Sequence, residues 1–273
     1  MTLSFHKYEG LGNDFVIVES TGSLALDAPG ICDRHFGVGA DGVLLIVPGT
    51  SAGARARMVV LNADGSRPEM CGNGIRCVAL HLALQDDAQG ISYVIDTDAG
   101  PLLCEVERDG NTAQVRVGMG PARPEPDFRL EVDGRALTFA RVSMGNPHAI
   151  SFDEPLDPAH ADRVGPLVSA ALPEGTNVEL ARQKGDESFD LVVWERGVGR
   201  TLACGTGACA TAVAAVRAGK ARYDSPIAID LPGGRLEIRV APDTLEVSMR
   251  GPARRVFSGE SPRWTLDAGF SRA

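Results

Sequence analysis

The feature that most constrains the fold of this chain is a repeated four-residue pattern, Cys-Gly-x-Gly. It occurs at residues 71–74 and again at 204–207, an offset of 133 residues. A second pair of motifs, Gly12-Asn13 and Gly145-Asn146, has the same offset. Two matches at one offset, close to half of the 273 residues, predict that the chain contains a duplicated domain.

Both halves of the chain contain more strand-like than helix-like segments. Runs of β-branched and apolar residues predict strands at 15–20, 42–48, 56–62, 92–97, 101–107, 113–118, 140–144, 177–182, 189–195, 227–231, 235–240, 244–249 and 254–259. Helical spacing of Ile75, Val78, Ala79 and Leu82 predicts a helix at 73–85, and an alanine-rich run predicts another at 206–218. Weaker patterns suggest helices at 28–36 and 159–171.

Many strands with one dominant helix in each half predict an α+β fold. We expect two pseudo-symmetric domains from an internal duplication, each a curved, mostly antiparallel sheet around a central helix. The proline-rich segment 120–128 is the expected connection between them. The first domain is then 1–122, with Cys71, and the second is 123–273, with Cys204. The last strands are able to cross back to the first domain.

Charge and composition exclude several classes of protein. The net charge of −9 argues against a general binder of nucleic acid or anionic membrane, because both depend on clustered Lys and Arg. The first residues, MTLSFHKYEG, do not have the pattern of an export signal, and no apolar run reaches the length of a membrane span. Six cysteines are too sparse for a disulfide scaffold, so we expect a reducing cytoplasm.

Each repeated turn places a thiol at the start of a predicted helix. The unpaired N–H groups and partial positive charge of a helix N-terminus lower the pKa of a thiol from about 8.5. The glycines let a bound anion approach the backbone closely. Each turn is therefore expected to be both an activated thiol and an anion cradle.

Two such turns facing one carboxylate substrate have the arrangement needed to invert an α-carbon. One cysteine, as thiolate, removes the α-proton, and the other, as thiol, returns a proton to the opposite face. The two thiols share one proton and titrate as a coupled pair. A pyridoxal phosphate route needs a lysine in a suitable setting, and neither Lys7, Lys184 nor Lys220 has one, so we expect no cofactor.

Several motifs, in order and nearly from end to end, resemble those of the diaminopimelate epimerases. The signature N-x-D-G-S followed by C-G-N-G-x-R is present as NADGSRPEMCGNGIR. The other matching segments are GLGNDFV, FGVGADG, MGNPHAI, GTNVEL, WERGVGRTLACGTGACA and YDSPIAIDLPGG. The resemblance implies a two-domain α+β fold and cofactor-independent interconversion of LL- and meso-diaminopimelate. It also implies a role in lysine and cell-wall precursor synthesis and a homodimer.

Carried over residue by residue, the resemblance makes Cys71 and Cys204 the proton-transfer residues. It implies that backbone N–H groups of Gly72, Asn73, Gly205 and Thr206 hold the α-carboxylate. It implies that Asn13, Asn62, Asn146, Asn177, Glu195 and Arg196 bind the substrate. Arg196 suits the distal carboxylate, and the asparagines and Glu195 suit ammonium groups. His148 and Glu195 are the expected modulators of the two cysteines.

Other interpretations of the same residues remain open. A racemase of proline or hydroxyproline would use the same two thiols, although Asn62, Asn177 and Arg196 suit a second charged end that proline lacks. A thiol-redox or ligand-binding protein would bind substrate without exchanging its α-proton. A zinc site of Cys71, Cys77, Cys204 and Cys209 has wider spacing than structural zinc pairs usually show, so we expect no metal. Cys77, Cys209, Cys32 and Cys104 are expected to be packed core thiols.

Overall fold

A computed structural model describes residues 3–22, 24–132 and 134–261 of the chain. The described residues form two compact units. The first unit contains the described residues up to Val117 and those from Pro252 onward, and the second contains Gly118–Gly251. Both division points lie inside strands, β7 (Thr112–Pro121) and β16 (Glu246–Ser261), so each of these strands contributes residues to both units.

The remaining elements divide between the units as follows. The first unit contains β1 (Leu3–Gly10), β2 (Asn13–Glu19), α1 (Ala28–Cys32), β3 (Gly42–Val47), β4 (Ala54–Asn62), α2 (Gly72–Gln85), β5 (Gly90–Thr97) and β6 (Gly100–Asp109). The second contains β8 (Arg123–Val132), β9 (Arg135–Ser143), β10 (Pro147–Ser151), α3 (Pro158–Ala170), β11 (Asn177–Gly185), β12 (Ser188–Glu195), β13 (Gly199–Thr201), α4 (Gly205–Arg217), β14 (Ile227–Leu231) and β15 (Gly234–Val240).

Strand pairing confirms the α+β class and the internal duplication. The strand order in the first unit is β16-β1-β2-β3-β4-β5-β6-β7, and in the second it is β8-β9-β10-β11-β12-β14-β15-β16. The pairs β2–β3 and β4–β5 are parallel, and so are their counterparts β10–β11 and β12–β14. The other pairs between neighbours in these two series are antiparallel. The sheets are therefore mostly antiparallel, as predicted, and share one topology.

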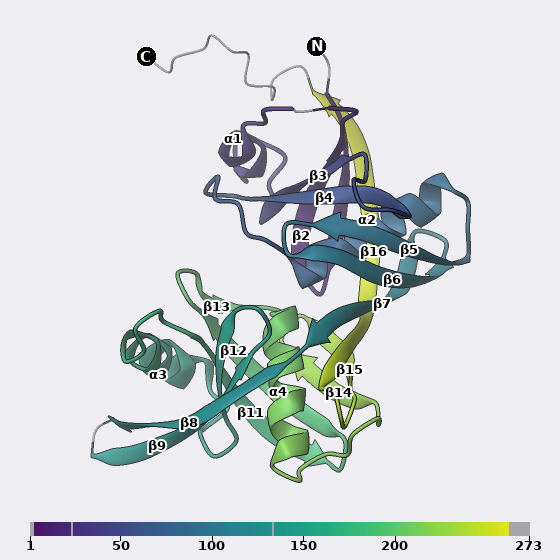
Figure 1. Cartoon of the computed structure of the whole chain (residues 1–273). Helices are drawn as coiled ribbons and strands as arrows, with labels where there is room; N and C mark the ends of the chain where they lie inside the picture. Colours follow the sequence, from purple (N-terminus) through teal and green to yellow (C-terminus); the bar gives the residue numbers. More distant parts are fainter. Residues whose placement is uncertain (1–2, 23, 133, 262–273) are drawn as a thin grey trace. The chain divides into compact units, whose positions relative to one another are not determined.

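Each unit wraps its sheet around one central helix. In the first unit, α2 contacts β1 to β6, and every residue of α2 from Gly72 to Ala83 is buried. In the second, α4 contacts β9, β10, β11, β14 and β15 and is buried over most of its length (Figure 1). A helix that is buried on all sides needs small or apolar residues around its whole circumference, which explains the alanine-rich composition of α4.

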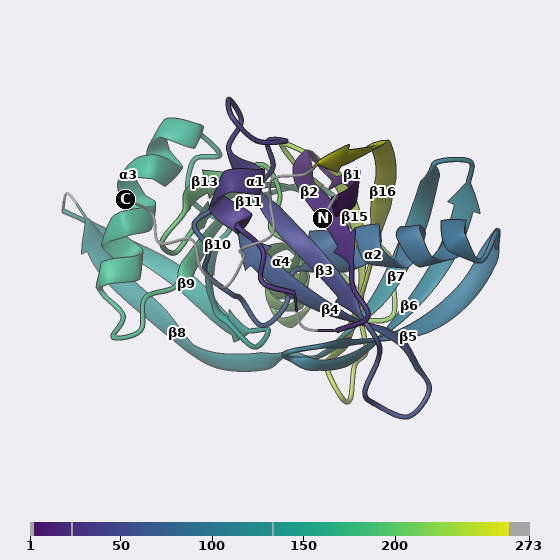
Figure 2. The ribbon, with the colours of Figure 1, turned by 90° about the horizontal axis from the view of Figure 1, so that it is seen from above.

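The outer face of each sheet carries a second helix, α1 in the first unit and α3 in the second. Val16, Val18, Val43 and Leu45 form one apolar cluster with residues of α1. In the second unit, α3 packs beside β11, β12 and β13 (Figure 2). Because side chains alternate along a strand, residues between these apolar positions point to the central helix. The strands β2, β3, β10 and β11 are thus covered on both faces.

Two predictions about the elements are wrong in part. The helix expected at 28–36 ends at Cys32, because the carboxylate of Asp33 accepts the N–H groups of His35 and Phe36 and turns the chain. The segment 120–128 is not an irregular loop, because it forms the end of β7 and the start of β8, with only Ala122 between the two strands. Proline is tolerated on β8 because that strand is the last in its sheet, where one edge needs no N–H donors. Among the described residues, no helix is long and apolar enough to cross a membrane.

Candidate active site

Each unit carries one group of candidate site residues at the start of its central helix, which we call its half-site. The first half-site surrounds Cys71, the N-terminal cap of α2. Its backbone is extended, and its Sγ accepts a hydrogen bond from the N–H of Gly74 at 3.4 Å. Asn73 donates from Nδ2 to Oδ1 of Asn13 at 3.2 Å. Asn13 donates in turn to the carboxylate of Asp41 at 2.6 Å. The structure therefore joins the motif at the start of β2 to the motif at the start of α2.

A fully buried arginine supports this first turn. The guanidinium of Arg76 donates to the carbonyl of Gly72 at 3.1 Å, to Oδ1 of Asn73 at 3.0 Å and to the carbonyl of Pro252 at 3.1 Å. Sequence reasoning assigned no role to Arg76, although it closes the C-G-N-G-x-R motif. The signal was that Arg76 is the only Lys, Arg, Asp or Glu in the predicted helix at 73–85.

Asn62 lies at the end of β4, two strands away from Asn13. It pairs with Gly42 of β3, and Gly42 is the register neighbour of Phe15 in β2. The side chain of Asn62 donates to Oγ of Ser66 at 2.9 Å, so Asn62 also holds the turn that follows β4. Three neighbouring strand ends of the first unit thus carry Asn13, Gly42 and Asn62.

The second half-site repeats the first around Cys204, the N-terminal cap of α4. Its Sγ accepts a hydrogen bond from the N–H of Gly207 at 3.4 Å. Asn146 lies 3.4 Å from Oγ1 of Thr206 through its Nδ2, which matches the Asn13–Asn73 contact of the first unit. The hydroxyl of Thr206 lies 3.5 Å from Sγ of Cys204. The four repeated positions therefore make equivalent contacts in both units.

Asn177, Glu195 and Arg196 lie together at one end of β11 and β12. Oδ1 of Asn177 accepts the backbone N–H of Arg196 at 2.9 Å, and the Arg196 guanidinium donates to the carbonyl of Glu174. Glu195 accepts the hydroxyl of Thr201 from the short strand β13 at 2.5 Å. The second unit thus gathers a guanidinium, a carboxylate and an amide at one strand end.

His148 lies at the start of β10, where it forms a completely buried hydrogen-bonded pair with Glu179 of β11. Nδ1 of His148 is 2.7 Å from Oε1 of Glu179, and neither side chain is exposed. Nε2 of His148 is 3.1 Å from Oδ1 of Asn146. Sequence reasoning missed Glu179, because nothing local shows that it faces His148. Only the parallel register of β10 and β11 brings the two together.

The electrostatic surroundings of Cys204 differ from the expectation for a helix start. Burial raises the pKa of the Cys204 thiol well above its ordinary value, and the negative charges of Glu195 and Glu179 raise it further. The bonds from Thr206 and from the N–H of Gly207 oppose this change. The prediction of a lowered pKa is therefore wrong for Cys204, because burial outweighs the helix N-terminus. The Cys204 environment favours the protonated thiol, which is the form of a proton donor.

The four cysteines expected to be core thiols are all buried: Cys32, Cys77, Cys104 and Cys209. Burial raises the pKa of Cys32 to about 11 and that of Cys104 to about 12. It raises the pKa of Cys77 as well. These values keep the thiols protonated and unreactive, which confirms their prediction as packing residues.

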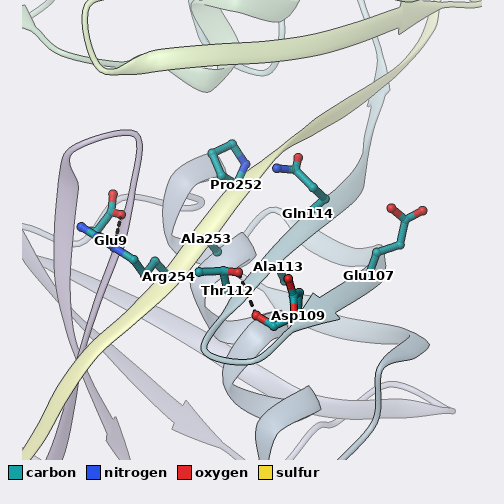
Figure 3. Close-up of a pocket in the computed structure, with 9 residues that line it drawn as sticks. All are labelled: Glu9, Glu107, Asp109, Thr112, Ala113, Gln114, Pro252, Ala253 and Arg254. Atoms are coloured by element: carbon teal, nitrogen blue, oxygen red, sulfur yellow. Dashed lines mark hydrogen bonds and ion pairs between the residues drawn. The ribbon is translucent and has the colours of Figure 1, made fainter.

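A hollow of about 560 Å³ in the first unit contains none of the expected site residues (Figure 3). Its lining residues are Glu9, Glu107, Asp109, Thr112, Ala113, Gln114, Pro252, Ala253 and Arg254. Arg254 donates to Glu9 at 3.0 Å, and the hydroxyl of Thr112 donates to the carbonyl of Asp109 at 2.8 Å (Figure 3). The hollow offers carboxylates but no nucleophile, so we place no chemistry there.

Among the described residues, one group of three possible metal ligands lies close together: His6, Glu19 and His81. Their ligand atoms all lie within 4.8 Å of one another. Nε2 of His81 already bonds Glu19 at 2.9 Å, and its Nδ1 lies 3.0 Å from the hydroxyl of Tyr8. The group includes neither Cys71 nor Cys204, so it has no part in the thiol chemistry.

Comparison with known proteins decides the family. The family model of diaminopimelate epimerase matches residues 5–124 and 140–256. The chain belongs to the diaminopimelate epimerase family. The resemblance that the motifs carried is thereby confirmed, and with it the class of isomerases.

Curated relatives of this family match nearly the whole chain. A diaminopimelate epimerase of Synechocystis sp. is 44% identical over 283 residues, covering 96% of this chain and 99% of that protein. One of Desulforudis audaxviator is 44% identical over 278 residues, covering 94% and 99%. A chloroplastic diaminopimelate epimerase of rice (Oryza sativa subsp. japonica) is 42% identical over 289 residues, covering 95% and 80%.

Solved structures of more distant proteins share the fold. A hydroxyproline epimerase from Agrobacterium vitis superimposes with a TM-score of 0.78 at 14% identity, covering 98% of this chain and 92% of that one. A phenazine biosynthesis protein of the PhzF family from Bacillus anthracis gives 0.75 at 17% identity, covering 96% and 99%. These likenesses confirm the predicted fold class and say nothing of the substrate.

Proposed function

We propose that this chain is a cofactor-independent epimerase that interconverts LL- and meso-diaminopimelate by proton transfer at the α-carbon, with Cys71 and Cys204 as the two acid–base groups. The observation that carries the proposal is the repeated half-site. Each unit holds one thiol at the cap of its central helix, with the same N–H contact to Sγ at 3.4 Å and the same asparagine beside the first turn.

The chemistry needs two thiols in opposite protonation states. The thiolate of one cysteine accepts the α-proton, which leaves the electron pair on the α-carbon and its carboxylate. The thiol of the other cysteine donates its proton to the opposite face of that carbon, so the configuration is inverted and the two cysteines exchange states. The reverse reaction uses the same groups with their roles swapped.

The first turns of α2 and α4 supply the stabilisation of negative charge that this step requires. The backbone N–H groups of Gly72, Asn73, Gly205 and Thr206 belong to the first turns of α2 and α4, where N–H groups point out of the end of the helix. Pointed at the α-carboxylate, they stabilise the charge that develops as the α-proton leaves. The glycines keep Cβ atoms out of the way of the anion.

The distal end of the substrate is assigned to the group at the ends of β11 and β12. The guanidinium of Arg196 forms paired bonds with a carboxylate, and Glu195 and the side-chain oxygen of Asn177 suit an ammonium group. In support, Asn177 accepts the N–H of Arg196, which fixes these two residues relative to each other. Asn13, Asn62 and Asn146 complete the proposed binding set, and His148 and Glu195 are assigned to tuning the thiols.

We further propose a cytoplasmic homodimer that acts in lysine and peptidoglycan precursor synthesis, without nucleic-acid or membrane partners. Support comes from the family and from the acidic net charge of −9. Light scattering of the purified chain tests the dimer, and a single species of 28.7 kDa would contradict it.

The decisive experiment follows the α-proton. The reduced protein is incubated in deuterated water with LL-diaminopimelate or with L-proline, and NMR records deuterium uptake and the meso fraction. We expect deuterium in diaminopimelate together with growing meso product, and none in proline. Exchange only into proline would keep the mechanism and overturn the substrate. No exchange into either would overturn the epimerase.

Three variants test the assignment of the thiols. Cys71→Ala and Cys204→Ala should each abolish turnover while substrate binding persists. Cys104→Ala removes a buried thiol that carries no role and should retain turnover in the folded protein. Full activity of either Cys71→Ala or Cys204→Ala would refute the two-thiol mechanism.

A further inference from the structure

The buried His148–Glu179 pair is a costly feature that the proposed mechanism does not itself explain. Both side chains are fully buried, and only Oε1 of the Glu179 carboxylate has a side-chain hydrogen-bond partner among the described residues. A buried carboxylate oxygen without a donor destabilises the fold. Such a group in a native structure calls for an explanation.

A continuous series of polar contacts leads from this pair to Cys204. From Glu179 it passes through His148 at 2.7 Å to Oδ1 of Asn146 at 3.1 Å. From Nδ2 of Asn146 it reaches the hydroxyl of Thr206 at 3.4 Å, and from there Sγ of Cys204 at 3.5 Å. All five residues belong to the second unit. The Glu179 carboxylate is therefore connected to the Cys204 thiol through the side chains of His148, Asn146 and Thr206, each in contact with the next.

The equivalent positions in the first unit are apolar. The register pair Phe15–Gly42 of β2 and β3 corresponds to His148–Asn177 of β10 and β11. Two residues further along β3, Leu44 stands where β11 has Glu179. The ionisable pair is thus not required by the duplicated fold, since Phe15 and Leu44 fill the same places around Cys71. It is specific to the half-site of Cys204.

The helix beside Glu179 is adapted to its carboxylate. A methyl group at Gly207 would lie 2.6 Å from Oε1 of Glu179, so any other residue there would force the carboxylate away from the first turn of α4. The equivalent methyl at Gly74 would meet the methyl groups of Leu44 at 3.0 and 3.3 Å. The partial positive charge of the helix N-terminus favours an anion in this place.

We propose that Glu179 is a positioning residue for proton transfer at Cys204. Its carboxylate accepts the Nδ1 proton of His148, which orients the ring so that Nε2 faces Oδ1 of Asn146. Asn146 in turn holds the Thr206 hydroxyl beside the thiol. The inference rests on the proposed function, because it assigns how one of the two proton-transfer groups is held.

Two replacements and one matched control test the role. Glu179→Gln preserves shape and removes the charge, and Glu179→Leu installs the side chain that the first unit uses. Each should lower kcat about tenfold or more in both directions and leave KM within about twofold, because neither touches the substrate. Glu131→Gln makes the same chemical change at an exposed site on β8 and should leave kcat unchanged. Wild-type kcat in both Glu179 variants would overturn the proposal.

A spectroscopic measurement tests the hydrogen bond without substrate. Long-range ¹H–¹⁵N spectra report which ring nitrogen of His148 carries a proton, with His148→Gln providing the assignment. We expect a protonated Nδ1 in the wild type and a changed Nδ1 signal in Glu179→Gln. An unprotonated Nδ1 in the wild type would overturn the proposal. Absence of epimerase activity in the wild type would instead refute the proposed function, while this spectrum still decides the pair.

Discussion

Gly207→Ala tests whether the buried carboxylate dictates the residue at the third position of α4. The added methyl would lie 2.6 Å from Oε1 of Glu179 and 3.3 Å from Sγ of Cys204. The carboxylate must move, which breaks its 2.7 Å bond to His148. Losing a hydrogen bond to a carboxylate costs about 1.5–3 kcal/mol, and overpacking adds about 1–3 kcal/mol. Replacing a glycine by alanine in a helix raises the free energy of unfolding by at most about 1 kcal/mol, which offsets part of this loss.

We therefore expect Gly207→Ala to lower the free energy of unfolding by about 2–4 kcal/mol. The matched control is Gly74→Ala at the equivalent position of α2. There the new methyl meets flexible Leu44 methyl groups at 3.0 and 3.3 Å, so the change should stay within about 1 kcal/mol of zero. Urea unfolding of both variants, followed by circular dichroism, supplies the two values.

A double-mutant cycle isolates the cause. In the Glu179→Ala background no carboxylate opposes the methyl, so Gly207→Ala should become neutral or stabilising by up to about 1 kcal/mol. The coupling between the two positions should then be about 2 kcal/mol or more. Equal cost of Gly207→Ala in both backgrounds, or equal cost at Gly207 and Gly74, would refute the reasoning.

Two further changes probe the frame of the first unit. The carboxylate of Asp96 accepts the backbone N–H groups of Thr50 and Ser51 at 2.7 and 2.9 Å, which hold its pKa well below the usual range. Asp96→Asn should lower the free energy of unfolding by about 2 kcal/mol at pH 7. In urea unfolding, the difference from the wild type should shrink below about pH 4, because a carboxylate with a lowered pKa in the folded state gives stability that is lost on acidification. A constant difference down to about pH 2 would contradict this. Arg76→Lys should lower the free energy of unfolding by about 3 kcal/mol, because a lysine cannot reproduce the guanidinium's bonds to Pro252 and to the first turn of α2. A loss below about 1 kcal/mol in the same assay would show that the planar guanidinium is dispensable.

Many residues of the candidate site could be predicted from the sequence because they belong to short motifs of neighbouring residues. A cysteine followed by glycines before an apolar or alanine-rich run predicts a helix cap, and α2 and α4 begin within one residue of the predicted starts. The 133-residue offset predicted the duplication, and pairs such as Asn13–Asn73 and Asn146–Thr206 repeat it in contacts. The positions of Cys71 and Cys204 as caps followed from these short-range patterns.

Other features were invisible because they depend on which strands become neighbours. The proline-rich segment 120–128 was expected to be an irregular connection, yet it forms the end of β7 and the start of β8, where the edge position of β8 tolerates proline. The last strands were expected to cross back to the first domain, but the point of crossing inside β16 depends on long-range pairing, since its residues from Arg254 onward pair with β1 and those near Val247 with β15. A local sequence pattern does not determine which strands pair with each other.

The sequence by itself determined that this chain carries two copies of one thiol-bearing unit, because a repeated motif and a helix cap each depend only on a few neighbouring residues. Only the tertiary structure decided that the copies differ electrostatically. Parallel register places Glu179 against His148 in one unit and Leu44 near Phe15 in the other. That difference arises between strands that lie about thirty residues apart in sequence, where burial and register, rather than local propensity, set the environment of Cys204.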